Sequence, residues 1–247
     1  MSRPSNPEEA RNALVELFAG FGSRRLISMK ARSERRQRID ASLARYDLSL
    51  EKLGVEIFDG LAFEDANGFP SKGVRGCFTS HMTLMQECAA SGQSMLVMED
   101  DVDFKFDRIV AFHQMVPDLQ QAGWDIVYLG YLFPQTRGPT RLERHEGGTI
   151  GGHFYGVTPE FAKAAAVYML SCTTRPRGDA VGGPMYRDAA FTMFRERHPE
   201  LVTKLAIPPL GDQFSSRSDL NPRRYQKWPL VGPLFDKMYE VKAWLRR

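Results

Sequence analysis

The sequence predicts an α/β fold in which one mixed, mainly parallel sheet carries helices on both faces. The first observation is alternation, because short apolar runs rich in strand formers take turns with segments whose apolar residues recur at helical spacing. The second is the run at residues 95–98, which suits a buried parallel strand and ends abruptly in Glu99, Asp100 and Asp101. The third is that the 247 residues contain no internal repeat, which favours one large domain.

The first half of the chain begins with a helix start signal. Asn6 is a good cap, Pro7 fits the first helical turn, and the acids that follow suit the positive end of a helix. We expect this helix to run to residue 18 and to stop at the glycines beyond it. The same reasoning predicts strands at residues 25–29, 55–58 and 95–98, a helix ending near residue 46, a loop at 66–73, and helices at 76–90 and 109–121.

The second half opens with the apolar run at residues 124–130, which is a clear strand pattern. Thr158 and Pro159 mark the start of a helix, with the threonine as its cap. Residues 133–148 and 208–222 are polar and turn-rich, so we expect irregular structure in both. The remaining patterns predict strands at 151–157 and 201–207, helices at 159–170 and 187–197, and a loop at 173–184 long enough to be a lid.

Composition narrows the class of protein. The hydrophobic share of 43% and the charged share of 26% are ordinary for a globular protein, and no run approaches the roughly 18 apolar residues of a membrane span. Cys77, Cys88 and Cys172 lack the number and spacing of a disulfide framework or a zinc site, so we expect free thiols in a reducing compartment. Because the first residues also lack the pattern of a secretory signal, the expected location is the cytoplasm.

Charge is distributed unevenly along the chain. Residues 24–38 carry a net charge of +6 and residues 223–247 a net charge of +5, whereas the whole chain carries +3, so the remainder is acidic. Two basic segments on an acidic body predict localised anion binding. They do not predict a surface that coats nucleic acid, and we expect no nucleic-acid partner.

The acidic residues that follow the strand at 95–98 are the first candidate site. They fall at the carboxyl edge of an open sheet, where α/β proteins bind ligands. Carboxylates this close together repel each other, and a hard cation such as Mg²⁺ or Mn²⁺ would relieve the repulsion while bridging to phosphate oxygens. From the residues alone, a solvated acidic turn remains an equal alternative.

A second motif lies just before this strand. The segments GCFTSHMTLMQ and LVMEDDVDF, at their spacing, resemble the paired signature of glycosyltransferase family 25, the lipopolysaccharide-type sugar transferases, to which collagen galactosyltransferase domains are related. The resemblance covers residues 25–219, because further pieces follow in matching order: RLISMKARSERRQRI, WDIVYLG, GGHFYGVTPEFA and PPLGDQFSSRSDL. The chain departs from the family pattern at Ser28, where the family has asparagine, at Val74, where an acid is common, and at Ala189, where glycine is common.

The resemblance implies a single GT-A-like domain that binds a nucleotide sugar together with a divalent metal, Mn²⁺ or Mg²⁺. It implies an inverting transfer of a hexose, commonly galactose, from a UDP-sugar to a glycan or glycolipid acceptor, as in lipopolysaccharide or cell-surface polysaccharide biosynthesis. Departure of the nucleoside diphosphate develops negative charge, which a cation held by protein carboxylates would neutralise.

On this interpretation the acidic stretch supplies the metal ligands Asp101, Asp100 and Asp103, with Asp101 the first choice. Arginine forks after the first strand, the Ser-His pair and a polar C-terminal loop would hold the donor. The predicted donor-binding residues are Arg32, Arg35, Arg36, Ser80, His81, Asp100, Gln213 and Ser218. Two alternatives stay open: that the histidine of the pair only orients a carboxylate or backbone group, and that the arginines form a solvated helix face.

An inverting transferase needs a carboxylate near the acceptor hydroxyl as its general base. Asp188 matches the family's aspartate in that part of the chain and is our candidate, with the alternative that it is an ordinary acid at a helix N-terminus. His153 is either a late metal ligand or a structural histidine on a strand among glycines.

The predicted organisation has three parts: a helical extension at residues 1–22, the glycosyltransferase domain at 23–222 and a basic amphipathic tail at 223–247. The tail predicts peripheral contact with an anionic membrane surface, or else packing on the domain. Two other functions remain to be separated from transfer: a non-catalytic fold member that binds nucleotide sugars or membranes, and a metal-dependent phosphohydrolase.

Overall fold

The computed structural model describes residues 6–121 and 123–214. Its centre is a seven-stranded sheet in which β1, β2, β3, β5 and β8 run in one direction and β6 and β7 run against them. The predicted α/β fold with a mixed, mainly parallel sheet is confirmed. In spatial order the strands are β2 (Glu56–Asp59), β1 (Ser23–Ser28), β3 (Met95–Glu99), β7 (Phe154–Val157), β5 (Ile126–Gly130), β8 (Thr203–Ile207) and β6 (Arg141–Arg144).

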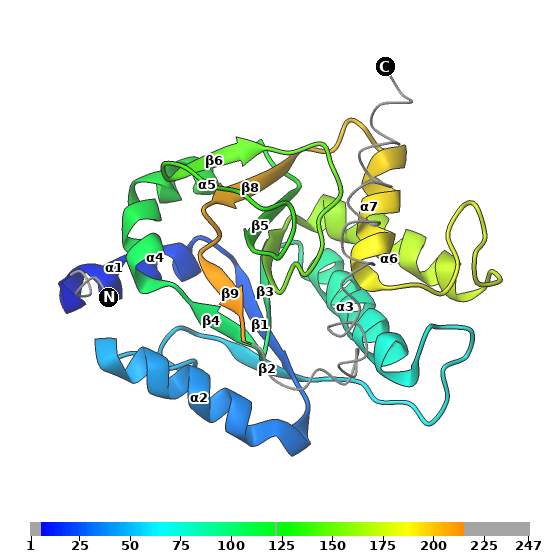
Figure 1. Ribbon diagram of the computed structural model, residues 1–247, viewed down its shortest axis with the longest axis horizontal. Coiled ribbons are helices and arrows are strands. Elements are labelled where there is room, and N and C mark those ends of the chain that lie inside the picture. Colours follow the sequence, from blue (N-terminus) through cyan, green and yellow to red (C-terminus); the bar gives the residue numbers. More distant parts are fainter. Residues whose placement is uncertain (1–5, 122, 215–247) are drawn as a thin grey trace, which may run out of the picture. The chain divides into compact units, whose positions relative to one another are not determined.

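Helices cover both faces of this sheet (Figure 1). One face packs against α1 (Pro7–Ala19), α2 (Ser33–Leu43), α4 (Phe106–Phe112) and α5 (Val116–Gln120), with short 3-10 turns at Lys30–Arg32, Ala44–Tyr46 and His113–Met115. The other face packs against α3 (Lys72–Ser91), α6 (Pro159–Thr173) and α7 (Arg187–Arg197). Successive side chains of β3 are buried on alternate faces of the sheet. Leu96 and Met98 join the hydrophobic cluster that includes α1, while Met95 and Val97 face the opposite side.

The predicted helix caps are confirmed. The side chain of Asn6 accepts a hydrogen bond from Glu8 N at the start of α1, and Thr158 accepts one from Phe161 N at the start of α6. The helix predicted at residues 76–90 begins earlier, at Lys72, because Ser71 caps it by accepting from Val74 N. The helix predicted at 109–121 is divided into α4, a 3-10 turn and α5, which carries Pro117 in its first turn.

Two segments predicted to be irregular contain strands. Arg141–Arg144 forms β6 at the edge of the large sheet, and Gly211–Gln213 forms β9, which pairs antiparallel with β4 (Val102–Phe104) in a second, two-stranded sheet. The prediction of irregular structure was therefore wrong at residues 141–144 and 211–213. The β4–β9 pair matters for function because it holds residues 211–213 beside the acidic turn that ends β3.

The described N-terminal helix shares the main core, since Leu14, Leu17 and Phe18 of α1 are buried against strands of the sheet. The compact unit that contains it ends at Phe214. The tail at 223–247 and the donor candidate Ser218 lie outside the described residues, so the predictions made for them, and the domain boundaries, stay predictions. In the described part of the chain, no helix is both long and apolar enough to cross a bilayer.

Candidate functional site

The candidate site forms where the strands of the large sheet end. The carboxyl ends of β1, β2, β3, β5 and β8 meet the start of β7 at one edge, because β7 runs against its neighbours. Glu99 is the last residue of β3, and Asp100 and Asp101 form the turn that leads into β4. The acidic stretch therefore lies at the sheet edge, as predicted, and each of its carboxylates has a different environment.

Asp101 has an incompletely satisfied carboxylate. Its Oδ2 accepts a hydrogen bond of 2.7 Å from the side-chain amide of Gln213, and its backbone oxygen accepts one of 2.7 Å from Phe214 N. Its Oδ1 is buried and has no hydrogen-bond partner among the described residues. Burial, together with the charges of Glu99 and Asp100, raises the pKa of Asp101 to about 7. A carboxylate with a buried, unpartnered oxygen can accept either a proton or a cation there.

Asp100 is held by an arginine. Its Oδ1 lies 2.6 Å from Nη1 of Arg35, and both side chains are largely buried. Arg38 donates to the backbone oxygen of Asp100 at 3.1 Å, and its guanidinium lies 3.9 Å from the centre of the Phe214 ring. Two residues predicted separately as donor ligands, Arg35 and Asp100, are thus an ion pair that joins α2 to the acidic turn.

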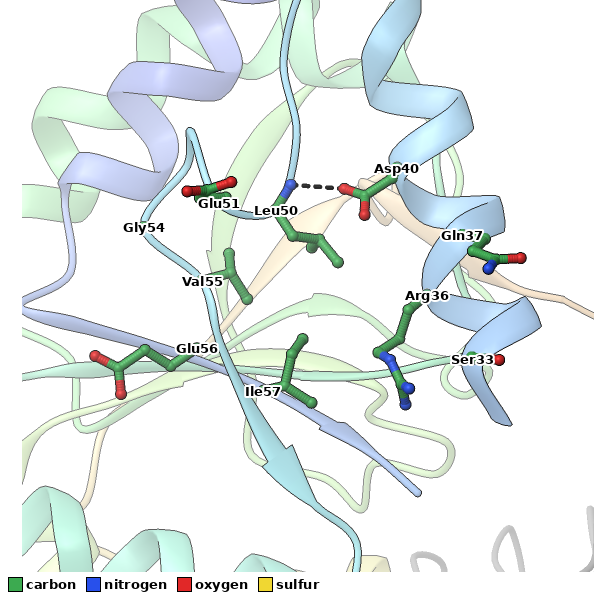
Figure 2. Close-up of a pocket in the computed structure, with 10 residues that line it drawn as sticks. All are labelled: Ser33, Arg36, Gln37, Asp40, Leu50, Glu51, Gly54, Val55, Glu56 and Ile57. Atoms are coloured by element: carbon green, nitrogen blue, oxygen red, sulfur yellow. Dashed lines mark hydrogen bonds between the residues drawn. The ribbon is translucent and has the colours of Figure 1, made fainter. Parts of the chain in front are cut away.

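The other predicted arginines lie at the end of β1. Nη1 of Arg36 donates to Ser28 Oγ at 3.0 Å and to Met29 O at 2.9 Å, so this side chain fastens α2 to the strand end. Arg32 closes the 3-10 turn that precedes α2. Beside Arg36, a cavity of about 580 Å³ runs between α2 and the edge strand β2 (Figure 2). Asp40 braces its wall by accepting a hydrogen bond of 2.8 Å from Leu50 N.

Asp103 has a basic partner. It lies on β4 opposite Asp212 of β9, and its Oδ2 is 2.7 Å from Nζ of Lys105, which also lies 3.3 Å from Asp212. The lysine already compensates the charge of this carboxylate. Asp103 is therefore less suited than Asp101 to be a metal ligand, and the prediction that it is a third ligand stays untested.

Glu99 turns inward and meets a buried arginine that sequence reasoning missed. Nη2 of Arg187 donates to Glu99 Oε1 at 2.9 Å and to Gly152 O at 2.9 Å, and the guanidinium is almost inaccessible to solvent. Burial by itself would raise the pKa of Glu99, but His81 and Arg187 outweigh it and lower the pKa to about 2. Glu99 is therefore a charged structural partner and is not available to an external cation.

The Ser-His pair on α3 is buried and positions other groups. His81 Nδ1 lies 2.6 Å from Tyr155 Oη and Nε2 lies 3.3 Å from Glu99 Oε1, while burial and the nearby guanidinium lower the pKa of the imidazole. Ser80 Oγ accepts a hydrogen bond of 2.9 Å from Leu61 N. Gly76, four residues before Ser80, lies on the same helix face, and a side chain there would collide with Leu61 O. This geometry favours the orienting role over direct donor contact.

Asp188, the predicted base, lies in the first turn of α7. Its Oδ2 accepts a hydrogen bond of 2.7 Å from Gly151 N in the segment before β7, and its Oδ1 is 2.6 Å from Nη1 of Arg187. The pKa of the neighbouring Cys77 thiol is raised by burial and further by the charges of Glu99, Asp188 and Asp101. All three carboxylates are therefore close enough to Cys77 to affect its pKa, although they come from distant parts of the chain.

Two other groups have the side chains of metal ligands, but ligand atoms in both already contact other residues of the protein. His153 is fully buried, with Nδ1 2.7 Å from Gly151 O and Nε2 3.2 Å from Gly211 O, so it ties β7 to the β9 segment. Ligand atoms of Cys77, His81 and Glu99 lie within 4.8 Å of one another. A cation in that group would have to compete with the buried guanidinium that neutralises Glu99, which makes the open oxygen of Asp101 the better metal ligand.

A comparison with known protein families matches the part of the chain that contains the acidic stretch. The family model for glycosyltransferase family 25 (LPS biosynthesis protein) matches residues 23–122. The predicted resemblance to this family is confirmed. The matched segment contains Arg35, Ser80, His81 and the whole acidic stretch, whereas Asp188 and Gln213 lie beyond it.

Curated relatives come from animals and a virus. The chain is 28% identical over 155 residues to inactive glycosyltransferase 25 family member 3 of Homo sapiens, covering 55% of this chain and 26% of that protein. It is 30% identical over 142 residues to procollagen galactosyltransferase 1 of Danio rerio, covering 49% of this chain and 23% of that protein. A match of 36% over 93 residues links it to putative glycosyltransferase R655 of Acanthamoeba polyphaga mimivirus, covering 32% and 28%. The chain thus spans about a quarter of the length of these relatives.

The family 25 signature acquires a physical explanation from this geometry. Gly76 and Ser80 hold the segment after β2, His81 approaches the last residue of β3, and the acidic residues follow in the turn. Arg187, which neutralises Glu99 from the opposite part of the chain, has no comparable signal. A single arginine in the first turn of a helix looks like a solvent-facing residue, and only its burial reveals the role.

Proposed function

We propose that this chain is a metal-dependent glycosyltransferase domain that moves a hexose, galactose in the first instance, from a UDP-sugar to a glycan or glycolipid acceptor with inversion. The observation that carries the proposal is the Asp101 carboxylate. It lies at the end of β3 inside the segment matched by family 25, and one of its oxygens is buried without a partner among the described residues. A membrane-facing or cytoplasmic setting, such as lipopolysaccharide or cell-surface polysaccharide biosynthesis, belongs to the same proposal.

The chemistry of the donor set fits a hard divalent cation, Mn²⁺ or Mg²⁺. Asp101 would hold it, with Asp100 beside it, and bound there it would neutralise the charge that develops on the departing diphosphate. Arg35 orients Asp100 and compensates its charge through their 2.6 Å contact. Gln213 fixes the orientation of Asp101 from the other side. Together these residues give a site whose ligands are aimed before the substrate arrives.

Proton removal from the acceptor is assigned to Asp188. Gly151 N and Arg187 hold this carboxylate in place, and it shares an electrostatic neighbourhood with Asp101. A carboxylate separate from the metal ligands is what inverting transfer requires as a general base. The nucleoside part of the donor is assigned to the cavity beside Arg36, between α2 and β2 (Figure 2).

Two measurements on the full chain test the proposal. Mass spectrometry of a panel of UDP-sugars detects slow donor hydrolysis without knowledge of the acceptor, and calorimetry measures UDP binding with and without Mn²⁺. We expect metal-dependent UDP binding, and hydrolysis of at least one UDP-hexose that Asp101→Asn abolishes. Unchanged hydrolysis in Asp101→Asn would remove this residue from the metal site.

A non-catalytic role is the second candidate, because several relatives are themselves named inactive. In that case UDP and Mn²⁺ would bind together without donor hydrolysis or transfer to any acceptor. Binding of metal without UDP would instead favour a phosphohydrolase. The same two experiments therefore separate all three functions.

A further inference from the structure

A second cavity, of about 330 Å³, is lined in part by residues of β9, the strand that pairs with β4 just after the acidic turn. The segment after β5 and the turn between β8 and β9 form its walls. The lining residues are Arg108, Tyr131, Leu132, Pro134, Gln135, Thr136, Arg137, Pro208, Pro209, Asp212 and Gln213. Gln213 is the residue whose side chain binds Asp101, so one wall of this cavity is in direct contact with the proposed metal ligand. Its size is at the lower end for small-ligand sites, which suits one or two sugar rings.

The lining has two kinds of surface. Leu132 and three prolines are apolar, whereas arginine, glutamine, threonine and aspartate side chains supply donors and acceptors. A sugar ring has the matching character, because its C–H faces are apolar and its hydroxyls point outward around the rim. Planar guanidinium and carboxylate groups can each bind two neighbouring hydroxyls at once.

Several polar groups of the cavity are held in place before any ligand binds. Nη1 of Arg108 contacts Asp212 Oδ1 at 3.0 Å and Pro209 O at 2.9 Å, which leaves Nε and Nη2 without a partner among the described residues. Thr136 Oγ1 lies 2.8 Å from Tyr131 Oη, and that hydroxyl also donates to Ala206 O at 2.9 Å. Side chains fixed in this way lose little entropy when a ligand binds.

Exposed apolar residues lie between this cavity and the segment that contacts Asp188. Leu132, Phe133 and Ile150 are all exposed, and backbone hydrogen bonds from Leu132 N and Phe133 N to Ile150 O join the two segments. The next residue, Gly151, donates its N–H to Asp188. Backbone hydrogen bonds therefore link Leu132 of the cavity wall to the segment that holds Asp188.

We propose that this cavity is the acceptor subsite and that it binds the terminal hexose of the acceptor glycan. The inference rests on the proposed function, because an acceptor is required only if sugar is transferred. A phosphate group is a poorer occupant, since Asp212 places a carboxylate in the wall beside Arg108. Specificity for the acceptor sugar then depends on Arg108, Gln135 and Arg137, whereas donor binding depends on the separate cavity between α2 and β2.

The test compares two cavity variants with matched controls. Arg137→Ala removes an exposed guanidinium that lines the cavity. Its control, Arg45→Ala, removes an exposed guanidinium that does not line the cavity. Leu132→Ser removes a leucine side chain that is 52% exposed, and Leu170→Ser does the same on α6 at a residue that is 50% exposed. All four positions are on the surface, so the variants are expected to fold.

Each variant is assayed for UDP-galactose hydrolysis alone and for transfer to methyl β-D-glucoside, methyl β-D-galactoside and other methyl hexosides. We expect the ratio of transfer to hydrolysis to fall about tenfold or more in Arg137→Ala and Leu132→Ser, and to stay unchanged in the controls. A ratio equal to that of the controls would overturn the inference, whatever happens to hydrolysis itself.

Failure of the proposed function has a different signature. If the wild type neither hydrolyses nor transfers any donor sugar, the cavity is still tested by saturation-transfer NMR with the same methyl hexosides. Saturation transfer in the wild type and both controls, lost in the two cavity variants, would support a sugar site. No saturation transfer in the wild type, or equal transfer in all five proteins, would overturn it. Displacement of the glycoside by inorganic phosphate would identify an anion site and also overturn the inference.

Discussion

The side-chain amide of Gln213 donates a 2.7 Å hydrogen bond to Oδ2 of Asp101, across 112 positions of sequence. This contact exists because β9 pairs with β4, which starts immediately after the acidic turn. It fixes one oxygen of the carboxylate and leaves the other, buried, without a hydrogen bond in the described part of the chain. Gln213 therefore orients the proposed metal ligand and also lines the proposed acceptor cavity.

Replacing Gln213 by alanine should weaken metal binding. Groups that orient a metal ligand contribute about 10- to 100-fold to affinity, so we expect a loss of that size for Mn²⁺ in Gln213→Ala. Calorimetric titration of Mn²⁺ in the presence of UDP measures it. Gln114→Ala, at an exposed position on the turn after α4, is the control. Equal affinity in the two variants would contradict the orienting role.

The raised pKa of Asp101 predicts how stability depends on pH. The folded carboxyl has a pKa of about 7, above its ordinary value near 3.9, so the folded state holds a proton that the unfolded state has lost. Stability from this group is therefore greatest at low pH and is lost as pH rises from about 4 through 7. His81, whose pKa is lowered, acts in the opposite direction below about pH 6.5.

Because His81 and Asp101 change the stability in opposite directions as pH rises, the effect of Asp101 is isolated by comparing the Tm of the metal-free wild type with that of Asp101→Asn. We expect the Tm of Asp101→Asn to exceed that of the wild type by an amount that grows between pH 5.5 and 8. Added Mn²⁺ should raise the Tm of the wild type alone at pH 8. Calorimetry at several pH values measures both effects, and a difference that is constant with pH would refute the burial of an uncompensated charge.

Removing Arg187 should destabilise the fold. Arg187→Met leaves the carboxylates of Glu99 and Asp188 without their guanidinium partner, and breaking a buried pair in this way costs about 3–5 kcal/mol. Adding Glu99→Gln should recover part of the loss, because it removes one of the stranded charges. Urea unfolding of both single variants and the double variant gives the coupling, and strictly additive losses would argue against the pair.

Ser80 separates a structural role from donor contact. Ser80→Ala leaves Leu61 N without its acceptor, which we expect to cost about 1–3 kcal/mol of stability. The affinity for UDP in the presence of Mn²⁺ should stay within about twofold of the wild type. The reverse result, weaker UDP binding at unchanged stability, would show that the hydroxyl contacts the donor as the sequence first indicated.

Asp188→Asn tests the base. The amide keeps the size of the side chain and its approach to Gly151 N but cannot take a proton. We expect transfer to fall by about 10²- to 10⁴-fold while UDP binding is retained. Steady-state kinetics and UDP titration supply the two readouts. If transfer survives, Asp188 is the helix N-terminal acid of the alternative interpretation.

Much of the fold could be predicted because it depends on local patterns. Apolar runs, the caps at Asn6 and Thr158, and the break in periodicity after residue 98 all act within a few residues, and the structure confirms the elements they indicate. The strands β6 and β9 were missed for the same reason. They are short and polar, and only pairing with β8 and β4 makes them strands.

Local sequence patterns were enough to indicate the class of fold, the resemblance to glycosyltransferase family 25 and the position of the acidic stretch after a buried strand. Only the tertiary structure decided what each carboxylate does: Glu99 neutralises Arg187, Asp100 pairs with Arg35, Asp103 pairs with Lys105, and Asp101 keeps an open oxygen. The physical reason is that these residues are chemically alike and adjacent in sequence. The role of each depends on its burial and on partners that the sheet order brings from as far as 112 residues away.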